Sequence, residues 1–138
     1  MVTSPGDSAD ATACQAWLES IARFVWVVLP EISDYEVPRE LIRAKRFAGL
    51  RRLDQLKATV DYQPITTAIM LDAAELWAVA RQQGRATADP KALDGDVIIA
   101  AHARSLERFG WDVVVATDNV GHIGLFVEAD NWDRIPAS

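Results

Sequence analysis

Cysteine and histidine are scarce in this chain, and long apolar runs are absent. The single cysteine, Cys14, excludes an internal disulfide and is typical of a reducing compartment, so we expect a cytoplasmic protein. With two histidines besides, the sequence offers no cluster that suggests zinc. No apolar run approaches the roughly eighteen residues of a membrane span, and no basic N-terminal segment marks a signal peptide. The sequence therefore predicts no membrane association.

Basic residues are also in deficit. Fourteen Lys and Arg stand against twenty Asp and Glu, which gives a net charge of −6. A basic face is the usual electrostatic footprint of nonspecific nucleic-acid binding, so any phosphate substrate would need bridging cations. The 138 residues are half hydrophobic, which is ordinary for one globular domain spanning 1–138.

Hydrophobic periodicity divides the chain into alternating helices and strands. Helices are expected over 11–24, 31–49, 50–61, 68–83 and 94–109, and strands over 24–29, 62–66 and 112–117. Pro38 should bend or divide its helix, and Gly49 should end it. Thr66 or Thr67 should cap the long helix that Gly84 ends. The alternation predicts an α/β fold with a short, mainly parallel sheet covered on both faces, a three-layer α/β/α sandwich.

The segment DGDVIIAAHA, residues 94–103, places two acids before an almost wholly apolar helix. Such a helix must be buried. Asp94 and Asp96 could simply cap its start, where free N–H groups and the macrodipole favour carboxylates. They could also bind a cation.

Other oxygen ligands follow the expected strands: Glu36 after the first, and Asp118 with Asn119 after the last. Because ligands gather beyond the carboxyl ends of parallel strands, these side chains can converge with Asp94 and Asp96. Carboxylates brought so close repel unless a divalent cation neutralises them, and hard oxygen ligands suit Mg²⁺ or Mn²⁺. The expected chemistry is phosphodiester hydrolysis by a metal-bound water.

The same segments resemble the PIN domain of metal-dependent ribonucleases over nearly the whole chain. The family's segment with a metal-binding glutamate resembles PEISDYEVPREL (30–41). Its aspartate followed by an apolar Ile-Ala-Ala run resembles GDVIIAAHA (95–103), and its motif at the end of a later strand resembles TDNVGHI (117–123). SPGDSADATACQAWL (4–18) resembles the loop and helix that follow the family's first strand. The resemblance implies an endoribonuclease of toxin type with Glu36, Asp96 and Asn119 as catalytic residues and Asp94 and Asp118 as further metal ligands.

Family members begin with an apolar strand that ends in an aspartate, and this sequence begins just after that point. The resemblance therefore implies impaired metal binding, a PIN-like fold without its N-terminal strand, and unpaired strand edges. An alternative is a noncatalytic interaction module, held as a homodimer or bound to an antitoxin-type partner. A small-molecule phosphatase using the same acids is a third possibility.

Several candidate residues also have ordinary structural explanations. Glu36 has Arg39 and Arg43 at helical spacing and could form a surface ion pair. Asn119 could serve a turn, and we expect His122 to be structural or capping rather than a general base. We expect His102 to be partly buried with its hydrogen bonds satisfied, and the five tryptophans to belong to the core.

Overall fold

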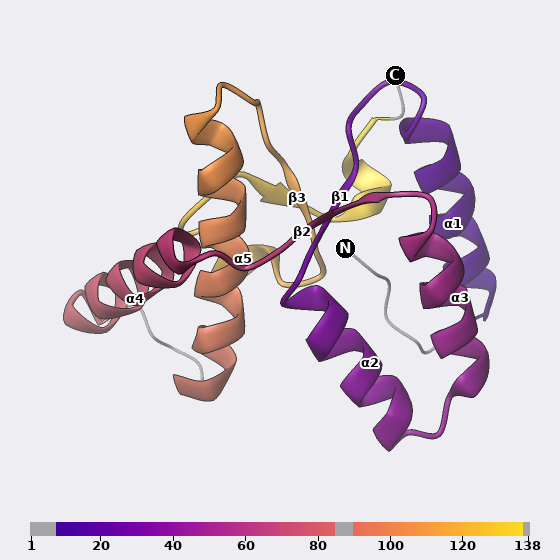
Figure 1. Cartoon of the computed structure of the whole chain (residues 1–138), viewed down its shortest axis with the longest axis horizontal. Helices are drawn as coiled ribbons and strands as arrows, with labels where there is room; N and C mark the ends of the chain where they lie inside the picture. Colours follow the sequence, from indigo (N-terminus) through magenta and orange to yellow (C-terminus); the bar gives the residue numbers. More distant parts are fainter. Residues whose placement is uncertain (1–7, 85–89, 137–138) are drawn as a thin grey trace.

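The structure, a computed structural model, describes residues 8–84 and 90–136, with the backbone alone described at 8–12 and 90–93. Six α-helices, four short strands and one 3₁₀ turn make up this part of the chain (Figure 1). In chain order they are α1 (Ser8–Ile21), β1 (Val28–Pro30), α2 (Ser33–Arg43), α3 (Phe47–Lys57), β2 (Asp61–Gln63), α4 (Thr67–Gln82), α5 (Pro90–Arg108), β3 (Val115–Ala116), α6 (Val120–Ile123), β4 (Ala129–Asp130) and the 3₁₀ turn (Trp132–Arg134).

The strands form two parallel pairs rather than one sheet. β1 pairs with β2, so that Leu29 lies opposite Tyr62, and β3 pairs with β4, so that Ala116 lies opposite Asp130. Among the described residues no strand joins the two pairs. The fold is therefore mixed α/β with parallel pairing, as the alternation of elements predicts, and β1 and β3 each carry a partner on one edge only.

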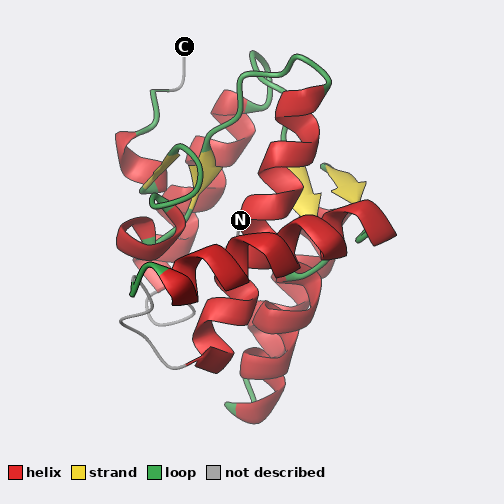
Figure 2. Cartoon of the chain, turned by 90° about the vertical axis from the view of Figure 1, so that its left-hand side faces the viewer, coloured by secondary structure: helices red, strands yellow, loops and turns green. Residues whose placement is uncertain are grey.

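The helices gather in two groups about these strands. In Figure 1, α4 and α5 lie on one side of the strands and α1, α2 and α3 on the other. Figure 2 shows how far helix outweighs strand in the chain. None of the described helices combines the length and the apolar character that a membrane crossing requires.

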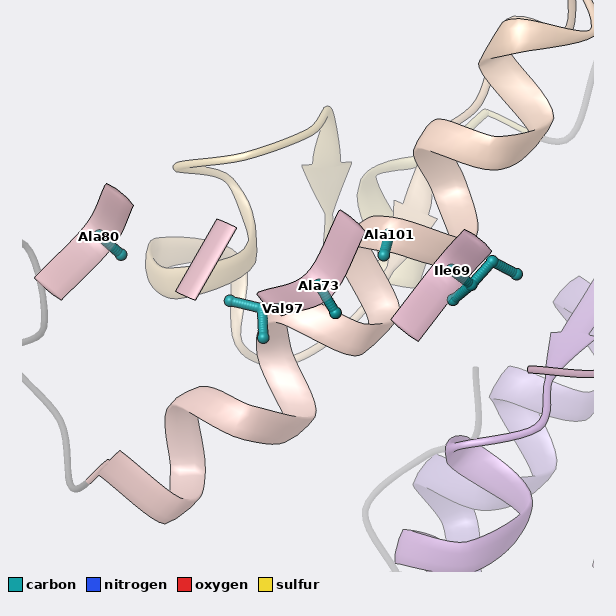
Figure 3. Close-up of a cluster of buried hydrophobic side chains, with 5 residues drawn as sticks. All are labelled: Ile69, Ala73, Ala80, Val97 and Ala101. Carbon is teal, nitrogen blue, oxygen red and sulfur yellow. The ribbon is translucent and has the colours of Figure 1, made fainter. Parts of the chain in front are cut away.

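The principal core lies between α4 and α5. Its buried side chains are small or branched and come from both helices: Ile69, Ala73, Ala80, Val97 and Ala101 (Figure 3). Alanines at a helix contact let the two backbones approach closely, so the apolar run of α5 is buried as its composition predicts. Asp72 of α4 is buried beside this core and pairs with Arg104, whose Nε lies 2.8 Å from its carboxylate, and with Arg108.

The ends of the long helices follow local chemistry. The Thr66 hydroxyl accepts a hydrogen bond from the Ile69 N–H at 3.2 Å, which satisfies one of the free donors at the start of α4. Gly84 follows α4 with φ +66° and Gly110 follows α5 with φ +94°, a region that side chains disfavour. Both the cap at Thr66 and the helix stop at Gly84 were expected from the sequence.

The helix bounds after Pro30 exclude the division expected at Pro38 and contradict the helix end expected at Gly49. Pro38 does not divide α2, which runs unbroken from Ser33 to Arg43. Gly49 does not end a helix but lies inside α3, because the turn comes earlier, at Lys45 with φ +56°. A Cβ at Gly49 would lie 2.8 Å from a Leu41 methyl group, so this glycine permits α2 and α3 to pack closely.

The expected buried strand over 24–29 is also only partly present. β1 begins at Val28, whereas Phe24 is 68% exposed and Trp26 is 47% exposed. The ring of Trp26 lies 4.9 Å from that of Trp111, which is itself half exposed, so the expectation that all tryptophans are core residues is wrong. A β-branched and aromatic run is buried only where other elements cover its faces and edges. Among the described residues, no strand pairs with the second edge of β1.

Candidate functional site

Three sequence-distant polar residues meet beyond the carboxyl ends of β1 and β3. Glu36 lies in the first turn of α2, directly after β1, and Asn119 stands just before α6, directly after β3. Asp96 comes from α5, which packs beside α6. Their convergence shows that β1 and β3 end at the same side of the molecule, where parallel strands present ligand-binding residues.

Asp96 is the centre of the contacts in this group. It is buried, and its Oδ1 accepts a hydrogen bond from the Asn119 side-chain amide at 2.9 Å. His122 of α6 places its Nδ1 3.8 Å from Asp96 Oδ2. Within the described residues Oδ2 is buried without a hydrogen-bond partner, which is costly for a carboxylate oxygen. The site therefore contains an acceptor that is ready for a cation or a donor.

Glu36 approaches Asp96 because the intervening residue on α5 has no side chain. A Cβ at Gly95 would overlap Oε2 of Glu36, so glycine there leaves the room that the glutamate occupies. Arg39, one turn further along α2, lies 3.8 Å from the Glu36 carboxylate. The ion pair that helical spacing suggests is thus present, although both partners are substantially exposed and it contributes little stability.

Burial disfavours the charged forms of both acids, and the charge of Asp96 adds to this effect at Glu36. Burial raises the pKa of Glu36, Arg39 lowers it, and the nearby Asp96 raises it further. Burial likewise raises the pKa of Asp96, while the Asn119 hydrogen bond and His122 lower it. Two carboxylates that resist ionisation side by side are stabilised by a positive charge between them.

The acids of DGDVIIAAHA do not open their helix. α5 begins at Pro90, so Asp94 and Asp96 lie inside the helix, and the cap interpretation is wrong for both. Proline is favoured in the first turn of a helix because its missing N–H has no intrahelical partner there. The helical backbone continues through Gly95, and this geometry places Asp96, rather than Asp94, on the buried side.

The remaining expected ligands are exposed rather than buried. Asp94 is exposed on α5, and Asp118 is exposed beside Asn119. Over the residues that the structure describes, no three His, Cys, Asp or Glu side chains are grouped so as to hold a metal ion. Any cation here would depend on Glu36 and Asp96 with help from the Asn119 amide.

The structure tests one of the two histidine predictions. His122, expected to be structural or capping rather than a general base, lies against Asp96 in the candidate site, and its role stays a prediction. Its position one turn after Asn119 was the available signal. His102 was expected to be partly buried with its hydrogen bonds satisfied, yet it is 2% exposed, and neither ring nitrogen has a hydrogen-bond partner among the described residues.

The chain was compared with protein-family models, curated proteins and solved structures, and none of them matches.

Proposed function

We propose that this chain is a PIN-like endoribonuclease dependent on Mg²⁺ or Mn²⁺, with a three-layer α/β/α arrangement and Glu36, Asp96 and Asn119 as its working residues. The observation that carries the proposal is the convergence of these three residues around a buried carboxylate oxygen that accepts no hydrogen bond from the described residues. The single cysteine supports a reducing compartment such as the cytoplasm.

The donor set fits a hard divalent cation. Mg²⁺ is held in proteins by one or two carboxylates and keeps several waters, so Glu36 and Asp96 suffice as charged ligands. When bound, the ion would activate a water for attack on a phosphodiester and offset the negative charge of the phosphate. Asn119 orients Asp96 through its amide, and the exposed Asp118 beside it is available as a further oxygen ligand.

The basic side chains of α3 are candidates for contact with a polyanionic substrate. Lys57 of α3 lies 3.0 Å from Asp34, which stands two residues before Glu36 on α2. Arg51 and Arg52 of α3 are exposed. In this proposal, exposed cationic side chains on α3 would bind the RNA backbone.

The test combines metal binding with RNA cleavage. The purified chain is titrated with Mn²⁺ by calorimetry and incubated with a 5′-labelled structured RNA in Mn²⁺ or Mg²⁺. Binding is expected to raise the melting temperature, since a ligand at one hundred times its Kd adds about 2.7 kcal/mol to stability. Cleavage should stop on addition of EDTA and in Asp96→Asn or Glu36→Gln.

Glu75→Gln is the matched control, because Glu75 is an exposed acid on α4. It should bind Mn²⁺ and cleave RNA as the parent chain does, whereas a copurifying nuclease would leave cleavage unchanged in Asp96→Asn and Glu36→Gln as well. Absence of both metal binding and cleavage would contradict the proposal and leave a noncatalytic interaction module. Turnover of a simple phosphate monoester without RNA cleavage would instead indicate a phosphatase.

A further inference from the structure

An apolar groove runs between the two strand pairs. Its cavity is about 640 Å³, and residues 24–30 and 111–119 line it from the β1 and β3 segments. Helix α5 contributes Ile99, His102, Ala103 and Leu106, which share one helical face, and α1 contributes Trp17, Leu18 and Ile21. The groove therefore has a strand edge on each side and a helix on each face.

The backbone of both walls offers hydrogen-bonding groups to this groove. On β1, Val27 and Glu31 bond to β2, through Asp61 N–H to Val27 O at 3.2 Å and Glu31 N–H to Gln63 O at 2.9 Å. In a parallel strand the direction of these groups alternates with each residue, so the N–H and C=O of Val28 point the other way, to the groove.

The same alternation holds on the opposite wall. The N–H groups of Val115 and Thr117 bond to β4, at 2.9 and 3.0 Å. The N–H and C=O of Ala116 are therefore directed away from β4 and toward β1. Two strand edges whose N–H and C=O groups point into the same groove are the template that an added strand requires.

A buried polar side chain points to the same conclusion. His102 lines the groove, is 2% exposed, and has two ring nitrogens without hydrogen-bond partners in the described part of the chain. Burying an unpartnered polar group is unfavourable, and a peptide backbone or side chain in the groove would supply the missing partner.

The charges around the groove define what its occupant must carry. The charged residues that line it are acids: Glu36 and Asp118 at its carboxyl end, and Asp112 at the other. No Lys or Arg is among the described residues that line it. An occupant with an apolar middle and basic ends would complement this distribution.

We propose that this groove binds an extended peptide segment of a separate protein, an apolar β-strand flanked by Lys or Arg, which lies parallel to β1 and β3 and joins the two pairs into one sheet. Because helices cover both faces, the strand is apolar on both sides rather than alternating. At about 3.3 Å per residue, five apolar residues span about 17 Å of groove. The exposed ring pair of Trp26 and Trp111 lies at its amino end.

The test uses the full chain and a fluorescein-labelled peptide, KVIVIVK, in buffer without divalent cations. Fluorescence anisotropy should show saturable binding. The peptide KVIPIVK lacks one backbone N–H and should bind at least about tenfold more weakly, and the acid-flanked EVIVIVE should also bind more weakly. Hydrogen exchange should show new protection at the amides of Val28 and Ala116.

Charge reversal supplies a matched pair of protein variants. Asp112→Lys should weaken KVIVIVK binding by about three- to tenfold, whereas Glu75→Lys, an equal change of charge at an exposed position on α4, should not. The proposal is overturned if KVIVIVK does not bind, or if the proline peptide binds equally well. It is also overturned if the unliganded chain is a dimer with Val28 and Ala116 already protected, or if RNA rather than peptide protects them.

Discussion

His102 predicts how the stability of the chain depends on pH. The side chain is buried on α5 and is expected to stay neutral, because burial lowers its pKa to about 4 while Glu31 opposes the shift. Its ordinary value is 6.5, which is the value in the unfolded chain. At pH values between these two pKa values, His102 binds a proton in the unfolded state but stays neutral in the folded state.

The sign and size of the effect follow from that difference. The contribution of His102 is fully present above pH 6.5 and is lost as the pH falls toward the folded pKa of about 4. At about 1.36 kcal/mol per pKa unit, the free energy of unfolding should fall by about 3 kcal/mol across this range. That loss is a large share of the 5–15 kcal/mol typical of a domain.

Urea denaturation at pH 7, 6, 5 and 4 measures this loss, and a His102→Leu variant isolates it. Burial raises the pKa values of Glu36 and Asp96, so their contributions are lost as the pH rises and oppose that of His102. Because both proteins contain these acids, the difference between the two stability curves reports His102 alone.

The variant should therefore gain stability relative to the parent chain as the pH falls, by about 3 kcal/mol at pH 4. It should also be more stable at pH 7, since leucine removes two unpartnered nitrogens from the interior. Parallel stability curves from pH 7 to pH 4 would refute the reasoning, because they would mean that His102 is protonated equally in both states.

Three further predictions concern the cap of α4, the buried ion pair between α4 and α5, and the candidate site. Thr66→Ala should lower the free energy of unfolding by about 1 kcal/mol in urea denaturation, and Thr66→Ser should restore most of it, because the hydroxyl caps α4. Arg104→Met should cost about 1–3 kcal/mol by the same assay, because it removes the closest partner of the buried Asp72 carboxylate; an unchanged midpoint would show that the remaining pairing suffices. Gly95→Ala should retain the thermal stability of the chain but lose the Mn²⁺-induced rise in melting temperature, since the added Cβ displaces the Glu36 carboxylate.

Local patterns predicted the helices well, because their determinants lie close together in the sequence. The apolar run of α5, the Thr66 cap and the glycines after α4 and α5 each act within a few residues. The errors occur where a distant partner decides the outcome. Gly49 resembles a helix stop, but its role is to admit Leu41 of the preceding helix, and no local signal distinguishes the two.

The candidate site shows the same division. Parallel topology and an acid-rich strand end indicated that Glu36, Asp96 and Asn119 could meet, and the structure places them together. Sequence patterns did not predict that His122 lies beside Asp96 or that Asp94 is exposed. Those depend on where α5 begins and how it turns relative to α6, which is set by packing between helices.

The sequence by itself determined the helical segments, the parallel mixed α/β character and the set of polar residues available for chemistry. Periodicity, caps and breakers are local, and they operate before the chain is compact. Only the tertiary structure decided that the strands form two separate pairs, that Phe24 and Trp26 are exposed, and that His102 is buried without a partner among the described residues. Strand pairing and burial require groups far apart in the chain to meet, so their outcome depends on what stands beside each edge and face.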